Sequence, residues 1–179
     1  DLKIVRAGDA GAMTNKLVLT KDEPLADVVF GIDNTFAPVA TKNNIIEGEL
    51  TPIDFADVCF NVDLEYFRTN NLAIPSNWRD LTKKEYKGLT VIENPNTSST
   101  GLAFLVSTYA GFPPMTAGVI SPTVNWWLEL RDNDVKVAAS WEDAYYTDFS
   151  GSSGKGKYPI VLSYSSSPAD EVDEFGEPQ

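Results

Sequence analysis

The chain contains no histidine and a single cysteine among its 179 residues. Without histidine there is no Ser-His-Asp triad, no Cys-His pair and no imidazole ligand for zinc. Any acid–base chemistry would therefore depend on carboxylates, lysine or tyrosine. One cysteine supports neither a disulfide framework nor a metal site. Cys59 lies in the apolar run Val58-Cys59-Phe60, which predicts a small buried hydrophobic side chain.

Positive charge is also scarce, because the chain has 14 lysines and arginines but 26 acidic residues, which gives a net charge of −12. Neutralisation of phosphates supplies most non-specific affinity for nucleic acids, so a nucleic acid is not an expected partner. No apolar run approaches the ~18 residues that a membrane span needs, and the N-terminus lacks a signal-peptide pattern. We expect a globular protein that is either cytosolic or has lost a leader.

Strand patterns alternate with helical patterns along the chain, which predicts an α/β fold with a mostly parallel sheet. Apolar runs favour strands at residues 2–6, 26–32, 57–62, 89–92, 135–138 and 160–164. Helical patterns occupy residues 12–19, 78–86, 100–109, 123–130 and 141–149. Loops are expected at residues 47–52, 112–122 and 150–157, and residues 170–177 form an acidic tail.

Ligands of such folds bind beyond the carboxyl ends of the strands, so the turns that follow the strands are candidate sites. Asp9, Asp33 and Asp57 each lie at the edge of a predicted strand. Capping of a turn is the ordinary role of an aspartate in these positions. A carboxylate facing a ligand is the functional alternative.

A third turn, residues 94–101, carries Thr97, Ser98, Ser99 and Thr100 directly before an apolar helix. Free backbone N–H groups and hydroxyls at a helix start can bind an anion or a polar ligand. An ordinary N-cap needs only one such hydroxyl, and here four are consecutive. Ser98 and Ser99 are therefore candidate ligand-binding residues.

Aromatic residues gather near the last two predicted strands, with Trp141 and Tyr145 after one and Tyr164 at the end of the other. Spacing of i, i+4 and i+8 from Trp141 through Tyr145 to Phe149 is typical of a core-facing stripe. Trp141 and Tyr164 nevertheless lie at strand ends, where they could form a stacking wall for a flat or cationic ligand.

Several stretches together resemble the thiamine-binding substrate-binding proteins of bacterial ABC importers, within the type II periplasmic-binding-protein superfamily. The resemblance covers most of the chain, and each stretch alone would be a weak signal. The stretches are Gly8-Asp9-Ala10-Gly11 with Asn15-Lys16-Leu17, residues 26–34, residues 94–102, Ser140-Trp141-Glu142-Asp143-Ala144-Tyr145 and residues 161–169.

This resemblance implies specific roles for the candidate residues. Asp9 occupies the acidic position that faces the cationic thiazolium ring, and Ser98 and Ser99 match the turn that takes the hydroxyl or phosphate end. Trp141 matches the tryptophan that stacks on or flanks the ligand, and Tyr164 matches a tyrosine of the last crossing strand. Two positions depart from the family pattern: Ser140 replaces a glycine, and Asp170 stands where some relatives have a stacking tyrosine.

The resemblance further implies a two-lobed protein that closes on its ligand and performs no chemistry. Lobe one would comprise residues 1–56 and 165–179, and lobe two residues 57–164, in a chain truncated at both ends that lacks part of the ligand cage. The implied ligand is thiamine or a thiamine phosphate, the implied partner is the membrane permease of an ABC importer, and no cofactor or metal is expected. We also expect a monomer outside the cytoplasm, periplasmic or extracellular, with membrane attachment through a removed lipoprotein signal as one arrangement.

Two alternatives stay open at this point. A binding protein of the same fold could take iron, a polyamine or another anion. An enzyme could instead use Asp9 and Asp33 as a carboxylate-dependent hydrolase or for Mg-dependent phosphotransfer. A requirement for a divalent metal would favour the enzyme.

Overall fold

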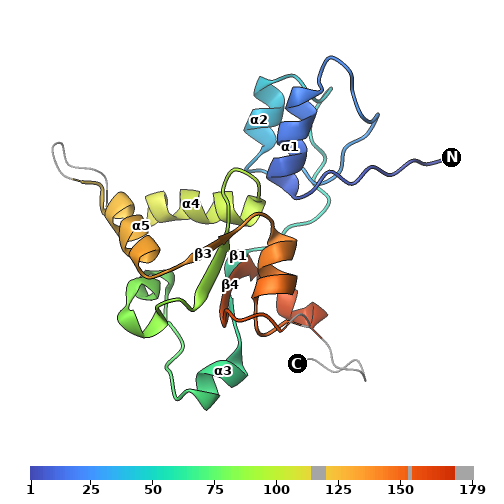
Figure 1. The fold of residues 1–179 in the computed structure, drawn as a ribbon. Helices are drawn as coiled ribbons and strands as arrows, with labels where there is room; N and C mark the ends of the chain where they lie inside the picture. The colour runs from blue at the N-terminus through green and yellow to red at the C-terminus, as the bar shows by residue number, and fades with distance from the viewer. Residues whose placement is uncertain (114–119, 153–154, 172–179) are drawn as a thin grey trace.

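The described part of the computed structural model comprises residues 1–113, 120–152 and 155–171, which build an α/β fold around one four-stranded sheet (Figure 1). The strands are β1 (Val58–Val62), β2 (Thr90–Glu93), β3 (Lys136–Ala138) and β4 (Ile160–Tyr164), in the order β1-β4-β2-β3. β2 runs parallel to both β3 and β4, whereas β1 is antiparallel to β4. The predicted fold class, with a mixed and mostly parallel sheet, is confirmed.

Side chains of the two central strands alternate between two hydrophobic clusters, one on each face of the sheet. Ile92, Ile160 and Leu162 join the larger cluster. That cluster includes Phe104 of α4 (Ser99–Gly111) and Trp126 of α5 (Pro122–Asp132). Val91 and Val161 point the other way and pack with Tyr145 and Phe149. Coverage of both faces explains why β2 and β4 read as continuous apolar runs.

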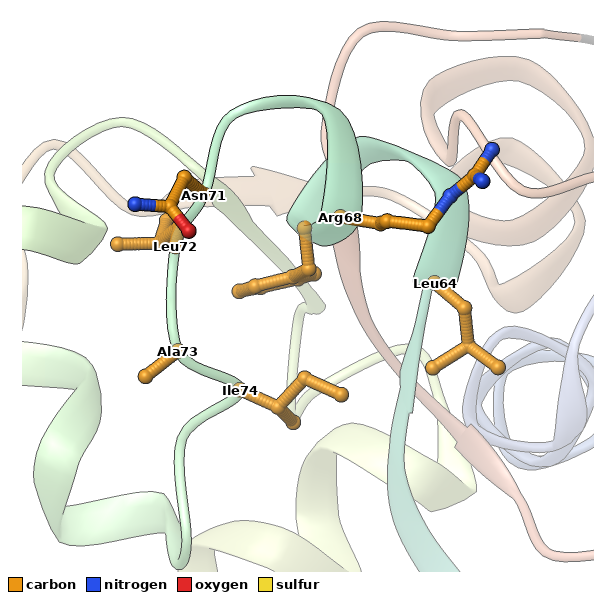
Figure 2. Close-up of a pocket in the computed structure, with 7 residues that line it drawn as sticks. Leu64, Arg68, Asn71, Leu72, Ala73 and Ile74 are labelled. Atoms are coloured by element: carbon orange, nitrogen blue, oxygen red, sulfur yellow. The ribbon is translucent and has the colours of Figure 1, made fainter.

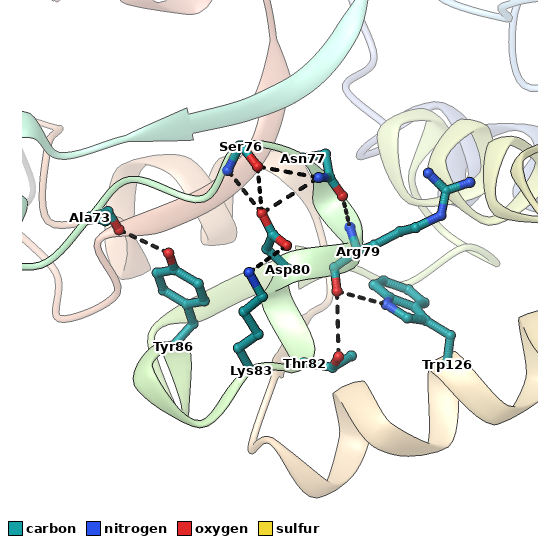
Figure 3. A network of polar contacts seen from close by, with 9 residues as sticks. All are labelled: Ala73, Ser76, Asn77, Arg79, Asp80, Thr82, Lys83, Tyr86 and Trp126. Carbon is teal, nitrogen blue, oxygen red and sulfur yellow. Dashed lines mark hydrogen bonds and ion pairs between the residues drawn. The ribbon is translucent and has the colours of Figure 1, made fainter.

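The segment predicted as a helix at residues 78–86 consists of two short 3₁₀ helices, η1 (Trp78–Thr82) and η2 (Lys84–Tyr86). Asp80 in the first of these helices links it to the preceding segment. Its carboxylate accepts hydrogen bonds from the Ser76 backbone N–H at 3.1 Å and from the Ser76 hydroxyl at 2.7 Å (Figure 3). Lys83 pairs with the same carboxylate at 2.8 Å. These partners, with Lys83 first, lower the pKa of Asp80 to about 2.

The last predicted helix, residues 141–149, is a π-helix over most of its length, η3 (Asp143–Asp148). Two short helices escaped prediction, α2 (Ala37–Lys42) and α3 (Leu64–Thr69). α2 has only six residues, so its hydrophobic period is too short to recognise. The first helix is α1 (Ala10–Leu19), which begins two residues earlier than the pattern indicated.

Two strand predictions were wrong: residues 2–6 and 26–32 belong to no strand ladder in the described chain. A strand forms only where a neighbour accepts its backbone hydrogen bonds, and no described segment does so for these two. Their apolar side chains are consequently left in solvent, with Ile4 77% and Val28 84% exposed. Cys59 is also less buried than predicted, because β1 forms one edge of the sheet.

The first 56 residues contribute α1 and α2, which pack against each other beside the sheet-containing body (Figure 1). The Ala12 N–H donates to the carbonyl of Thr97 at 3.0 Å, so α1 contacts the turn that precedes α4. Gly11 permits this approach, since a Cβ at that position would lie 2.7 Å from the Thr97 carbonyl carbon. The boundaries of the two lobes stay a prediction. Part of the expected second segment of lobe one, and most of the acidic tail, lie outside the described residues.

Candidate ligand-binding site

Asp9 connects two parts of the chain that are 132 residues apart. One carboxylate oxygen accepts the Ala10 N–H at 2.7 Å and caps α1. The other accepts the backbone N–H of Trp141 at 3.0 Å. The capping role expected of an aspartate is therefore real, and the same side chain also places a negative charge beside the tryptophan.

Trp141 is half-buried at the centre of an aromatic group. Its indole stacks on Tyr145 with ring centroids 5.1 Å apart and lies 6.1 Å from the ring of Tyr164. The indole N–H donates to the buried Ser163 hydroxyl at 2.9 Å, and Ser163 shares a 2.8 Å hydrogen bond with Ser167. Tyr145 is buried in the core, as the helical spacing predicted. Trp141 is only partly buried and lies on the solvent side of the stacked pair.

The serine-rich turn lies at the start of α4, as predicted, but its hydroxyls do not cap the helix in the ordinary way. Ser98 is the N-cap residue and makes no side-chain capping bond. Its buried hydroxyl lies 3.0 Å from that of Thr100, which donates to Glu93 at 2.6 Å. Ser99 is 5% exposed and hydrogen-bonds Tyr164. Both serines thus lie beneath the protein surface.

Negative charge surrounds Tyr164 at this junction. Burial raises the pKa of Tyr164 to about 12, with further contributions from Asp9, Asp33 and Glu93, while the hydrogen bond with Ser99 acts in the opposite direction. Asp33 is fixed by its own turn, where it accepts from the Thr35 hydroxyl at 2.8 Å and the Phe36 N–H at 3.1 Å. The phenol therefore stays protonated and can donate a hydrogen bond.

The structure brings seven of the predicted residues into one cluster, which we call the junction cluster: Asp9, Asp33, Ser98, Ser99, Trp141, Tyr145 and Tyr164. Asp57, the remaining candidate, is an exposed residue directly before β1. Glu93, Thr100 and Ser163 belong to the same place and were missed from the sequence. Glu93 could have been found, because a glutamate that ends the buried run Thr90-Val91-Ile92 interrupts an otherwise apolar strand. Ser163 gave no comparable signal.

Two cavities lie away from the junction cluster. One, of about 590 Å³, is lined by Leu64, Phe67, Arg68, Asn71, Leu72, Ala73 and Ile74 around α3 (Figure 2). Another, of about 390 Å³, lies between β1 and the segment at residues 74–78. Their walls are mainly aliphatic and aromatic and bring no carboxylate to a ligand, so the charged junction cluster is the stronger candidate.

The described residues offer neither a metal site nor a membrane-spanning helix. Within residues 1–113, 120–152 and 155–171, no three histidine, cysteine, aspartate or glutamate side chains gather closely enough to hold a metal ion. Over the same residues, no helix has the length and apolar character required to cross a membrane.

Comparison with known proteins identifies relatives of this chain. The family profile of the bacterial extracellular solute-binding proteins matches residues 25–175. The thiamine-binding periplasmic protein of Haemophilus influenzae is 31% identical over 172 residues, covering 88% of this chain and 48% of that protein. Its Salmonella typhimurium counterpart is 25% identical over 194 residues, covering 97% of this chain and 54% of that protein.

A solved structure described as a periplasmic thiamin binding protein superimposes with a TM-score of 0.75 at 22% sequence identity. The match covers 99% of this chain and 56% of that protein, and it confirms the predicted periplasmic-binding-protein fold. The chain thus spans about half the length of the curated relatives it matches.

Proposed function

The chain belongs to the family of bacterial extracellular solute-binding proteins, and on that premise we propose that it captures thiamine or a thiamine phosphate for import. The names of its relatives support this choice of ligand.

The observation that carries the proposal is the pairing of Trp141 with Asp9. An aromatic face attracts a cation through its quadrupole, and a carboxylate attracts it directly. Asp9 accepts the backbone N–H of Trp141, so both groups are held at one point beside Tyr164. A flat ring with a fixed positive charge, such as thiazolium, matches both attractions.

The start of α4 supports the assignment of the other end of the ligand. Backbone N–H groups of a first helical turn favour a hydroxyl or phosphate group. Ser99 and Thr100 occupy that turn, and Ser99 hydrogen-bonds Tyr164 of the junction cluster. Ser98 and Ser99 are buried, so lobe movement would have to expose this turn to the ligand.

The proposal includes the biological setting. The protein binds its ligand outside the cytoplasm, in the periplasm or at the cell surface, and delivers it to the permease of an ABC importer without chemical change. Lipid attachment and a monomeric state stay predictions.

Calorimetry with thiamine, thiamine phosphate, spermidine, ferric citrate and inorganic phosphate tests the proposal. We expect thiamine or its phosphate to bind and to stabilise the protein by RT ln(1 + [L]/Kd), or about 2.7 kcal/mol at a hundredfold excess over Kd. Binding of another compound in the panel, with no response to millimolar thiamine or thiamine phosphate, would reject the ligand assignment.

Substitution of Trp141 locates the site. Trp141→Ala should weaken thiamine binding about tenfold or more, and Trp141→Phe should retain part of the affinity, because a cation over an aromatic ring contributes roughly 0.5–2 kcal/mol. Tyr109→Ala is the control, since Tyr109 is an exposed aromatic residue of α4. Equal affinities for Trp141→Ala and Tyr109→Ala would show that the ligand binds elsewhere.

A further inference from the structure

Glu93 is a fully buried carboxyl group at the end of the central strand β2, with an exposed fraction of 0%. Its Oε2 atom accepts a hydrogen bond from the Thr100 hydroxyl at 2.6 Å. Its Oε1 atom has no hydrogen-bond partner among the described residues. An ionised carboxylate in such a place is costly, because burial removes its hydration and leaves one oxygen unpaired.

A chain of hydroxyl groups connects Glu93 to the turn before α4. Thr100 lies 2.6 Å from Glu93 and 3.0 Å from Ser98. The helix and the strand approach closely here, since a Cβ on Gly101 would lie 2.5 Å from the Glu93 carbonyl oxygen. The Glu93 carboxyl group therefore positions the Thr100 hydroxyl, and through it the Ser98 hydroxyl, from the buried side of the turn.

The charged and titratable groups around Glu93 come from several elements. Asp9, the N-cap of α1, acts on Glu93 electrostatically, and Glu93 in turn acts on Tyr164 of β4. Lys136 of the adjacent strand β3 is paired with Asp148 of η3 at 2.6 Å. That cation is thus already matched by a carboxylate, whereas the negative charge of Asp9 acts on Glu93.

We propose that Glu93 is a positioning residue that carries a proton in the ligand-free protein, and that a cationic ligand arriving beside Asp9 causes this proton to leave for solvent. The inference rests on the proposed function, because it requires a positively charged ligand at the junction cluster. Burial raises the pKa of Glu93 to about 8 against hydrogen bonds from Thr100 and from its own backbone N–H, and Asp9 adds a smaller rise; this supports a neutral acid at pH 7.

The coupling follows from linkage between two binding equilibria. A cation near Asp9 offsets the negative potential that Glu93 experiences, so the ionised form becomes more favourable when the ligand is bound. Reciprocally, ionisation of Glu93 strengthens the binding of the cation by the same factor. Thiamine affinity should therefore rise with pH between about 6 and 9, by roughly fivefold to tenfold within the usual range of such couplings.

Calorimetry of thiamine binding at pH 7 in phosphate and in Tris measures the protons released, because these buffers differ in ionisation enthalpy. The wild-type chain should release a fraction of a proton, and Glu93→Gln should release less and show a flatter affinity profile from pH 6 to 9. Glu142→Gln is the matched control, since Glu142 is an exposed glutamate next to Trp141, and it should behave like the wild type.

A titration of the ligand-free protein by carboxyl-carbon NMR provides a second measurement. One glutamate resonance should titrate well above the others and disappear in Glu93→Gln. Normal titration of every glutamate overturns the inference, as does thiamine binding with equal proton release in wild type and Glu93→Gln. In the latter case the proposed function stands. Failure of thiamine to bind at every pH rejects the proposed function and the coupling together.

Discussion

Asp9 uses its two carboxylate oxygens for two different elements. One oxygen caps α1 through Ala10, and the other receives the N–H of Trp141. An asparagine has a single acceptor oxygen, so it can reproduce only one of these bonds. The charge proposed for ligand binding is therefore combined with a structural role that requires both oxygens.

We predict that Asp9→Asn lowers the free energy of unfolding by about 1–3 kcal/mol, because one backbone N–H loses its partner. Urea unfolding of the ligand-free protein measures this loss. Asp33→Asn is the control, since Oδ1 of Asp33 accepts both the Phe36 N–H and the Thr35 hydroxyl, and the Oδ2 atom only shares that same hydroxyl. Similar losses for both variants would show that the bond between Asp9 and Trp141 contributes nothing specific.

Glu93 gives the stability of the protein a dependence on pH. Its pKa rises from an ordinary value of 4.5 to about 8 on folding, so between these values the folded state holds a proton that the unfolded state has lost. Stability therefore falls as pH increases, by up to about 1.4 kcal/mol per unit for this one group. Chemical unfolding at pH 5.5, 6.5 and 7.5 should show a steeper decline for wild type than for Glu93→Gln. Parallel declines would contradict the buried neutral acid.

At the scale of elements, the connection from β2 to α4 depends on close approach of helix and strand. A Cβ on Gly101 would lie 2.5 Å from the carbonyl oxygen and 2.9 Å from the carbonyl carbon of Glu93. Both contacts are with backbone atoms, so a side-chain rotation cannot relieve them. This approach positions Ser98, Ser99 and Thr100 against the end of the sheet.

We expect Gly101→Ala to destabilise the protein by about 1–3 kcal/mol, the usual cost of forcing extra atoms into a packed interior. Thermal unfolding measures the effect. Val106→Ala is a control on the same helix, because Val106 is 59% exposed. A Gly101→Ala protein as stable as Val106→Ala would mean that α4 can shift away from β2 at little cost.

For the molecule as a whole, backbone pairing is concentrated in the sheet and thin in the first 56 residues. β4 is hydrogen-bonded on both sides, to β1 and β2, and its residues 160–163 are buried. Residues 2–6 and 26–32 belong to no ladder among the described residues, and they expose Ile4 and Val28. Local stability should therefore differ strongly between these regions.

Hydrogen exchange followed by mass spectrometry should detect this difference. Peptides covering β2 and β4 should exchange slowly, at rates set by global unfolding, and peptides covering residues 1–8 and 26–32 should exchange rapidly. Comparable protection in both sets would mean that the N-terminal segments pair as strands in solution.

Much of the fold is determined by local features that a sequence displays directly. The apolar runs at β2 and β4 predicted buried strands, and the serine-rich turn predicted the start of α4. Asp9 was identified as an aspartate at the edge of a predicted strand, where capping is the ordinary role; the strand does not form, but Asp9 does cap α1. These features depend on residues close together in the chain, so their physical causes are visible in the sequence.

Tertiary structure alone decided the features that depend on distant partners. Residues 2–6 and 26–32 have strand-like composition, yet a ladder needs a neighbouring segment to accept its hydrogen bonds. Neither the second bond of Asp9, to Trp141, nor the bond between Trp141 and Ser163 follows from any local pattern. The burial of Glu93 likewise depends on how closely α4 approaches β2, because the sequence places a carboxyl group there while packing determines whether water reaches it.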